Sequence, residues 1–166
     1  MHRLALIAVL ALVAGIGCGG SDDGGSTTSN APVAAPGADA GTITKKQYIA
    51  TADVACSDFN GEVRKLPEPK DATDIGPLYR NIAGKADTFY DKFSAIPKPR
   101  GNQEILDRYQ RNLAQSIALT KQAASVIEKK EPKALPRVLK SARRVQRENR
   151  RIAKRFGFQV CGGVVR

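Results

Sequence analysis

Side chains that could perform catalysis or bind metals are scarce in this chain of 166 residues. The only histidine is His2, and the three cysteines, Cys18, Cys56 and Cys161, lie far apart in the sequence. Ser-His-Asp and Cys-His arrangements need a histidine as base, and structural zinc sites need four Cys or His ligands. The Glu-x-x-His pairs of di-iron helical bundles do not occur. We therefore expect no metal site, no cofactor and no catalytic residue, so that the protein is not an enzyme.

Three aspartates within expected helices, Asp53, Asp87 and Asp91, are the remaining candidates for acid–base chemistry. Carboxylates on long helices usually lie on the solvated face, and we expect these to do so. A Gly-x-Gly-x-x-Gly string runs from Gly15 to Gly20. A dinucleotide site requires a strand before such a string and a helix after it, and neither is expected here. We interpret the string as a chance match.

Residues 1–17 have the pattern of a secretory signal peptide. Arg3 supplies a positive start, and a run of about 13 apolar residues follows from Leu4 to Ile16. A membrane-spanning helix needs about 20 such residues. The run is therefore too short for a stable span and has the length of the apolar region of a signal peptide.

The residues at the end of this segment resemble the lipobox that bacterial signal peptidase II recognises. They read Gly15-Ile16-Gly17-Cys18, with glycine at the position where leucine is usual. The resemblance implies cleavage before Cys18, lipidation (palmitate) of that cysteine and anchoring on the extracytoplasmic face of the cell membrane. The alternative is an ordinary secreted protein in which Cys18 is a spare thiol.

Residues 18–42 predict a flexible linker after the lipidated cysteine. They contain almost only Gly, Ala, Ser, Thr, Pro, Asp and Asn, with Val33 as the single large aliphatic residue. Such a composition buries too little apolar surface to offset the entropy of ordering. A Gly/Ser-like chain of this length spans roughly 25–30 Å. The remaining residues, 43–166, have the size of one small domain.

If Cys18 carries lipid, Cys56 and Cys161 are an even pair in an oxidising compartment. A disulfide between them is the expected outcome. In the chain-entropy model, a bridge that closes so long a loop contributes about 4–5 kcal/mol of stability. Two cysteines without a histidine are too few ligands for zinc.

Helical periodicity dominates residues 43–166, and no useful length alternates with a period of two. The apolar spacing predicts four helices, over residues 44–66, 74–95, 102–130 and 133–156. Thr44 and Gln47 form a capping box at the first start, and Gly157 is a left-handed C-cap at the last end, followed by apolar Phe158. Long helices with short connections favour an all-α, up-down-up-down four-helix bundle, stapled by the Cys56–Cys161 disulfide.

Several motifs of this domain resemble a group of small, uncharacterised helical lipoproteins of high-GC Gram-positive bacteria. They are Tyr48-Ile49-Ala50, Ala52-Asp53, Cys56, the breaks Leu66-Pro67-Glu68-Pro69 and Ile96-Pro97-Lys98-Pro99, and Phe156-Gly157-Phe158-Gln159-Val160-Cys161-Gly162. The likeness covers the signal, the linker and the domain. These motifs are caps, proline breaks and a cysteine pair, so the resemblance implies a fold and a location but no activity.

The fourth expected helix carries most of the net charge of the chain, which is +11. Between Arg137 and Arg155, Glu148 is the only acid, and nine basic residues give this stretch a local charge of +8. At 100° per residue these nine fall within an arc of about 140°, opposite the apolar stripe. They are Arg137, Lys140, Arg143, Arg144, Arg147, Arg150, Arg151, Lys154 and Arg155.

The basic stripe predicts an interaction module whose partner is anionic. Given the expected location, the candidates are anionic lipid headgroups, anionic wall polymers or an acidic protein; nucleic acid is not expected outside the cell. The alternative is a solvated face that binds nothing.

A second functional hypothesis is a small apolar-ligand-binding or carrier bundle. Gly84, Ala86, Ala123 and Ala124 could leave room between the helices. Asn149 falls on the apolar stripe of the fourth helix, where it would contact a ligand, fix the helix register as a buried amide, or reach water at an edge.

The cysteine pairing gives a direct test. Thiol labelling of the secreted domain under non-reducing, denaturing conditions should detect no free Cys56 or Cys161. Stoichiometric labelling of both would contradict the pairing.

Overall fold

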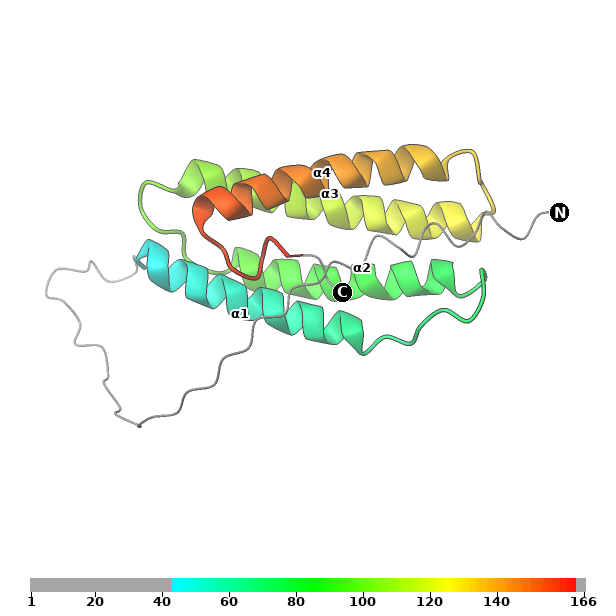
Figure 1. Cartoon of the computed structure of the whole chain (residues 1–166), viewed down its shortest axis with the longest axis horizontal. Helices are drawn as coiled ribbons and strands as arrows, with labels where there is room; N and C mark the ends of the chain where they lie inside the picture. The colour runs from blue at the N-terminus through cyan, green and yellow to red at the C-terminus, as the bar shows by residue number, and fades with distance from the viewer. Residues whose placement is uncertain (1–42, 164–166) are drawn as a thin grey trace, which may run out of the picture.

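All regular secondary structure of residues 43–163, the part of the chain that the computed structural model describes, is helical (Figure 1). The helices are α1 (Lys45–Arg64), α2 (Ile75–Ser94), α3 (Gln103–Glu128) and α4 (Leu135–Phe156). The prediction of an all-α fold with four helices is confirmed. The predicted signal peptide, Cys18 and the linker lie outside the described residues.

The predicted helix ends are also confirmed where the sequence specified their chemistry. Thr44 Oγ1 accepts the backbone N–H of Gln47 at 3.2 Å, and the Gln47 side chain accepts the backbone N–H of Thr44 at 2.8 Å. At the end of α4, Gly157 has a φ of 103°, a conformation that glycine adopts without steric penalty. The N–H groups of Gly157 and Phe158 both donate to the carbonyl of Ala153. α4 therefore stops at a defined point, and the chain turns back.

The helices pack in chain order, α1 on α2, α2 on α3 and α3 on α4 (Figure 1). No Cα atom of α1 lies within 8 Å of a Cα atom of α4. Only their ends meet, where the Lys45 ammonium lies 4.7 Å from the centre of the Phe156 ring. α1 and α4 therefore do not close the bundle by packing along their lengths.

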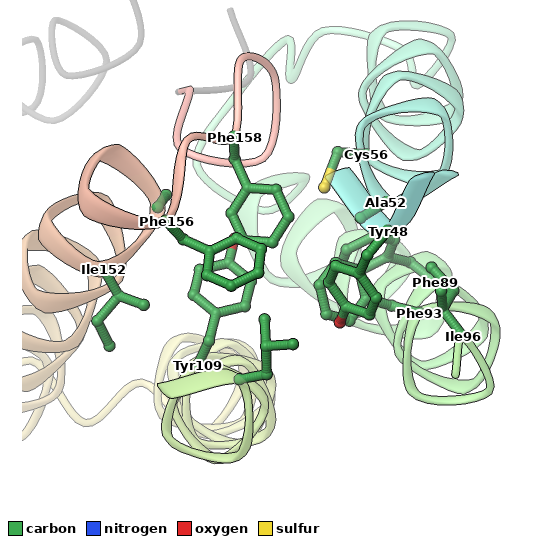
Figure 2. Packing of buried hydrophobic residues seen from close by; sticks show 12 residues of the cluster. Tyr48, Ala52, Cys56, Phe89, Phe93, Ile96, Tyr109, Ile152, Phe156 and Phe158 are labelled. Atoms are coloured by element: carbon green, nitrogen blue, oxygen red, sulfur yellow. The ribbon is translucent and has the colours of Figure 1, made fainter. Parts of the chain in front are cut away.

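The C-terminal tail, residues 158–163, fills part of the space between α1 and α4. Figure 2 shows Phe158 reaching from the tail into the aromatic cluster, with the Cys56 side chain pointing toward it from α1. Phe158 is 6 % exposed and lies 4.9 Å from Phe156 and 5.4 Å from Tyr109, centre to centre. Aromatic pairs at these distances add stability beyond the area they bury.

Three further contacts attach the tail to α1 and α3. The predicted disulfide joins Cys56 to Cys161, with 5.2 Å between their Cα atoms. The Asp53 carboxylate accepts the backbone N–H groups of Gln159, Val160 and Cys161 at 2.8, 2.9 and 3.0 Å. The Tyr109 hydroxyl donates to the carbonyl of Cys161 at 2.7 Å. The tail is thus a structural part of the domain.

The core has a large cluster and a small one. The large cluster includes the fully buried side chains Tyr48, Phe93, Leu106, Tyr109 and Phe156. The small cluster, centred on Ala123, Val126 and Val138, joins the C-terminal half of α3 to the start of α4. All four helices and the tail contribute to the large cluster.

The buried tyrosines predict that the free energy of unfolding falls in alkaline solution. Burial, and then the negative charge of Asp107, raises the pKa of Tyr48 to about 12, and burial raises the pKa of Tyr109. Above about pH 10 the unfolded chain ionises these phenols while the folded chain keeps them neutral, so stability is full below pH 10 and falls as the pH rises through the folded pKa. Absorbance at 295 nm and urea midpoints measured from pH 9 to about pH 12 check this.

Tyr48→Phe is the control, because it should flatten the alkaline fall in the urea midpoint. If all four tyrosines ionise together near pH 10 in the folded protein, the burial of Tyr48 and Tyr109 is wrong.

Candidate functional site

The candidate site lies on α4, whose two faces have opposite chemistry. Pro136, which is pre-organised for the first turn of a helix, stands near the start, and Gly157 ends the helix. The buried residues of α4 recur every three, four or seven positions and pack on α3 and the tail; the larger ones are Val138, Val145, Asn149, Ile152 and Phe156. The opposite side of the helix is left to solvent.

All nine predicted basic residues are exposed, and together they form what we call the basic face. Seven of them are arginines, namely Arg137, Arg143, Arg144, Arg147, Arg150, Arg151 and Arg155, and two are lysines, Lys140 and Lys154. The structure brings them together on one side of one helix, as the sequence predicted. What they bind stays a prediction.

Within residues 43–163 none of the nine forms an ion pair. The single acid of α4, Glu148, pairs instead with Arg108 of α3. The only carboxylate of α4 therefore lies in the contact with α3, and the basic face includes no acidic residue.

Arg147 is at the electrostatic centre of the basic face. Its helical neighbours at i−4, i−3, i+3 and i+4 are Arg143, Arg144, Arg150 and Arg151, all of them cations. Each like-charge pair at such spacing destabilises a helix by a few tenths of a kcal/mol. The arrangement therefore lowers the stability of α4 in the free protein and leaves it open to an anion.

Two of the three aspartates considered for acid–base chemistry make structural contacts instead. Asp53 holds the tail, and Asp87 pairs with Lys121 of α3 at 2.8 Å. Asp91 is exposed near the end of α2. In the described part of the chain, no three Cys, His, Asp or Glu side chains come together as a metal site would require.

A cavity of about 160 Å³ lies where α1 and α4 fail to meet. Asn149, which is 9 % exposed, lines it, and its Oδ1 atom is buried without a hydrogen-bond partner. No bond from Asn149 to another helix is present among the described residues, so register fixing by a buried amide has no support in this structure.

The small residues expected to make room for a ligand do not line this cavity. Ala86, Ala123 and Ala124 are buried, because small side chains let helices approach closely rather than hold them apart. Gly84 is exposed and belongs to a second, open groove along α2, whose lining also includes Leu66 after the end of α1. The cavity between α1 and α4 therefore lies elsewhere than at the four small residues.

Two contacts that shape the site carry no signal in the sequence. One is the Glu148–Arg108 pair, which joins two helices 40 positions apart. The other is the Asp53 carboxylate, which binds backbone groups more than 100 positions away. Neither is a local pattern.

No family model, no curated protein and no solved structure matches this chain. The resemblance to small helical lipoproteins therefore stays a prediction. None of the four described helices is long and apolar enough to cross a membrane.

Replacing Arg147 should stabilise the protein. Arg147→Glu turns four repulsive neighbour pairs into attractive ones, and we expect about 1 kcal/mol of added stability and a Tm higher by about 3–5 °C. Arg147→Gln should give about half the change, since it removes only the repulsion. Thermal unfolding at low and high salt measures both.

Salt provides the control, because screening near 1 M salt should bring together the Tm values of the unsubstituted chain, Arg147→Glu and Arg147→Gln. A Tm of Arg147→Glu that lies below that of the unsubstituted chain at low salt would show that Arg147 has a stabilising partner.

Proposed function

We propose that the protein is a membrane-anchored, non-enzymatic lipoprotein of the cell envelope. In this proposal its domain is an up-down-up-down helical bundle, and the basic face of α4 docks on an anionic phospholipid surface. The observation that carries the proposal is the set of nine exposed cations on α4, none of which pairs with an acid among the described residues.

The size and composition of the basic face suit a layer of phosphate groups. From Arg137 to Arg155 the helix rises about 27 Å, which is long enough to meet several headgroups in a row. Arginine, which supplies seven of the nine cations, can bind phosphate oxygens with two parallel N–H donors. A stripe of guanidinium groups along one side of α4 therefore suits an extended anionic surface.

The expected anchor makes a membrane the nearest such surface. A lipid on Cys18 and a linker of roughly 25–30 Å would keep the domain within about its own diameter of the headgroups. Each basic residue close to an anionic surface contributes about 1 kcal/mol at most. Several together add to the lipid anchor, which alone holds a protein only reversibly when it is a single chain.

Vesicle flotation of residues 43–166, which contain all four helices, the core and the disulfide, tests the proposal without the lipid. We expect binding to vesicles with anionic phospholipid and none to zwitterionic vesicles at about 50 mM salt, with loss of binding near 500 mM. Replacing four face residues by glutamine should lower the partition coefficient at least about tenfold. These are Arg143, Arg144, Arg147 and Arg151.

The chain offers a matched control in four exposed cations outside α4, namely Lys46, Arg64, Lys70 and Lys92. Their replacement by glutamine changes the net charge by the same amount and should leave binding within about twofold of the unsubstituted domain. Equal losses from the two variants would show that net charge alone acts. Binding to anionic wall polymers or to an acidic protein, but not to vesicles, would identify a different partner and overturn the membrane proposal.

A further inference from the structure

The space between α1 and α4 is only partly filled by the tail. Beyond Phe158 the tail runs through Val160 and Cys161 to Gly163, and these last residues form one wall of the 160 Å³ cavity. All four helices supply the other walls. An engineered apolar cavity of about 150 Å³ binds benzene, so this one has the size of a single aromatic ring.

The floor of the cavity is apolar. Phe59 of α1 stacks on Phe89 of α2, with 5.0 Å between ring centres and 28° between ring planes. Leu113 of α3 and the Cys56–Cys161 disulfide complete this surface. Phe59 and Leu113 are only half-buried although both pack against the core, and a ring in the cavity would cover them.

α4 contributes one buried polar side chain, Asn149, to the lining of the cavity. Asn149 lies among Val145, Ile152 and Phe156 on the buried face, and its Oδ1 has no partner in the described part of the chain. Its amide offers both a donor and an acceptor to a molecule in the cavity.

The rim of the cavity carries a positive charge. Arg150 lines the cavity from α4 and is exposed. It stands at the edge of the basic face, next in sequence to Asn149, and forms no ion pair with any described residue. Gln146, one turn earlier and also exposed at the rim, adds a neutral donor.

From these four walls we propose that the cavity binds a small aromatic carboxylate. The ring lies on Phe59 and Leu113, and the carboxylate accepts hydrogen bonds from the Arg150 guanidinium and from the Nδ2–H of Asn149. Arg150 belongs to both the cavity rim and the basic face, but binding in the cavity does not depend on the membrane contact.

Binding of benzoate to the purified full chain, followed by ligand-observed NMR and by the shift in Tm, tests the proposal. We expect saturable binding with a Kd below about 1 mM and at least tenfold weaker binding of acetate, which has the charge without the ring. Arg150→Gln should weaken benzoate about tenfold and leave benzyl alcohol unchanged.

Two variants separate the ligand role of the cavity from its role in folding. Ser116→Leu places a side chain into the cavity from α3 and should abolish binding of both probes while Tm stays the same or rises. Asn149→Val removes both the Nδ2 donor and the unpartnered Oδ1 and should weaken benzoate at least about fivefold without lowering Tm. Arg151→Gln, a basic-face residue that does not line the cavity, is the matched control and should bind benzoate as the unsubstituted chain does.

Three outcomes would overturn the proposal. They are the absence of saturable benzoate binding, binding that survives Ser116→Leu, and equal losses from Arg150→Gln and Arg151→Gln. Binding that occurs only after deletion of residues 164–166, which follow Gly163 at the cavity wall, would also overturn it, because the end of the chain would then be the occupant.

Discussion

The attachment of the C-terminal tail to α1 is the constraint on which the rest of this domain depends. α1 and α4 do not pack along their lengths, so the tail must connect them. It does so through one covalent bond, through three N–H groups held by Asp53, and through the Phe158 ring inside the core. Hydrogen bonds to a carboxylate are stronger than those between neutral groups. A disulfide in addition limits the freedom of the unfolded chain.

This attachment determines what α4 can present to its surroundings. Because α4 packs along its length on α3 and meets α1 only at its C-terminal end, its outer side contacts no other described helix. Burial on one side requires apolar residues, and the other side is free to carry charge. Glu148 faces α3 and pairs with Arg108, so the outer side has cations only. The resulting repulsion lowers stability, and a surface that neutralises the charge would recover it. Because α1 and α4 do not pack along their lengths, the cavity remains between these helices and the tail.

The sequence predicted the parts of this structure that depend on local patterns. Capping at Thr44, the left-handed Gly157 and the opposite faces of α4 all follow from residues within a few positions of one another. The Cys56–Cys161 pair followed from cysteine number and compartment. Periodicity shows which face of a helix is buried but not which helix it meets, so the separation of α1 from α4 could not be predicted. The cavity was expected at small residues such as Ala123, which in the structure pack tightly. Its actual position depends on the path of residues 158–163, and on contacts such as Asp53 to Val160 that span more than 100 residues.

In the proposed function, the unpaired cations of α4, rather than the positive charge of the whole protein, contact an anionic bilayer. Side-chain Nε–Hε resonances of the arginines, recorded by NMR for residues 43–166 with and without anionic nanodiscs, test it residue by residue. We expect the resonances of Arg144, Arg147 and Arg151 to shift or broaden on the bilayer, while those of Arg64 of α1 and Arg80 of α2 stay unchanged. Equal changes on all helices, or changes confined to α1 and α2, would contradict it.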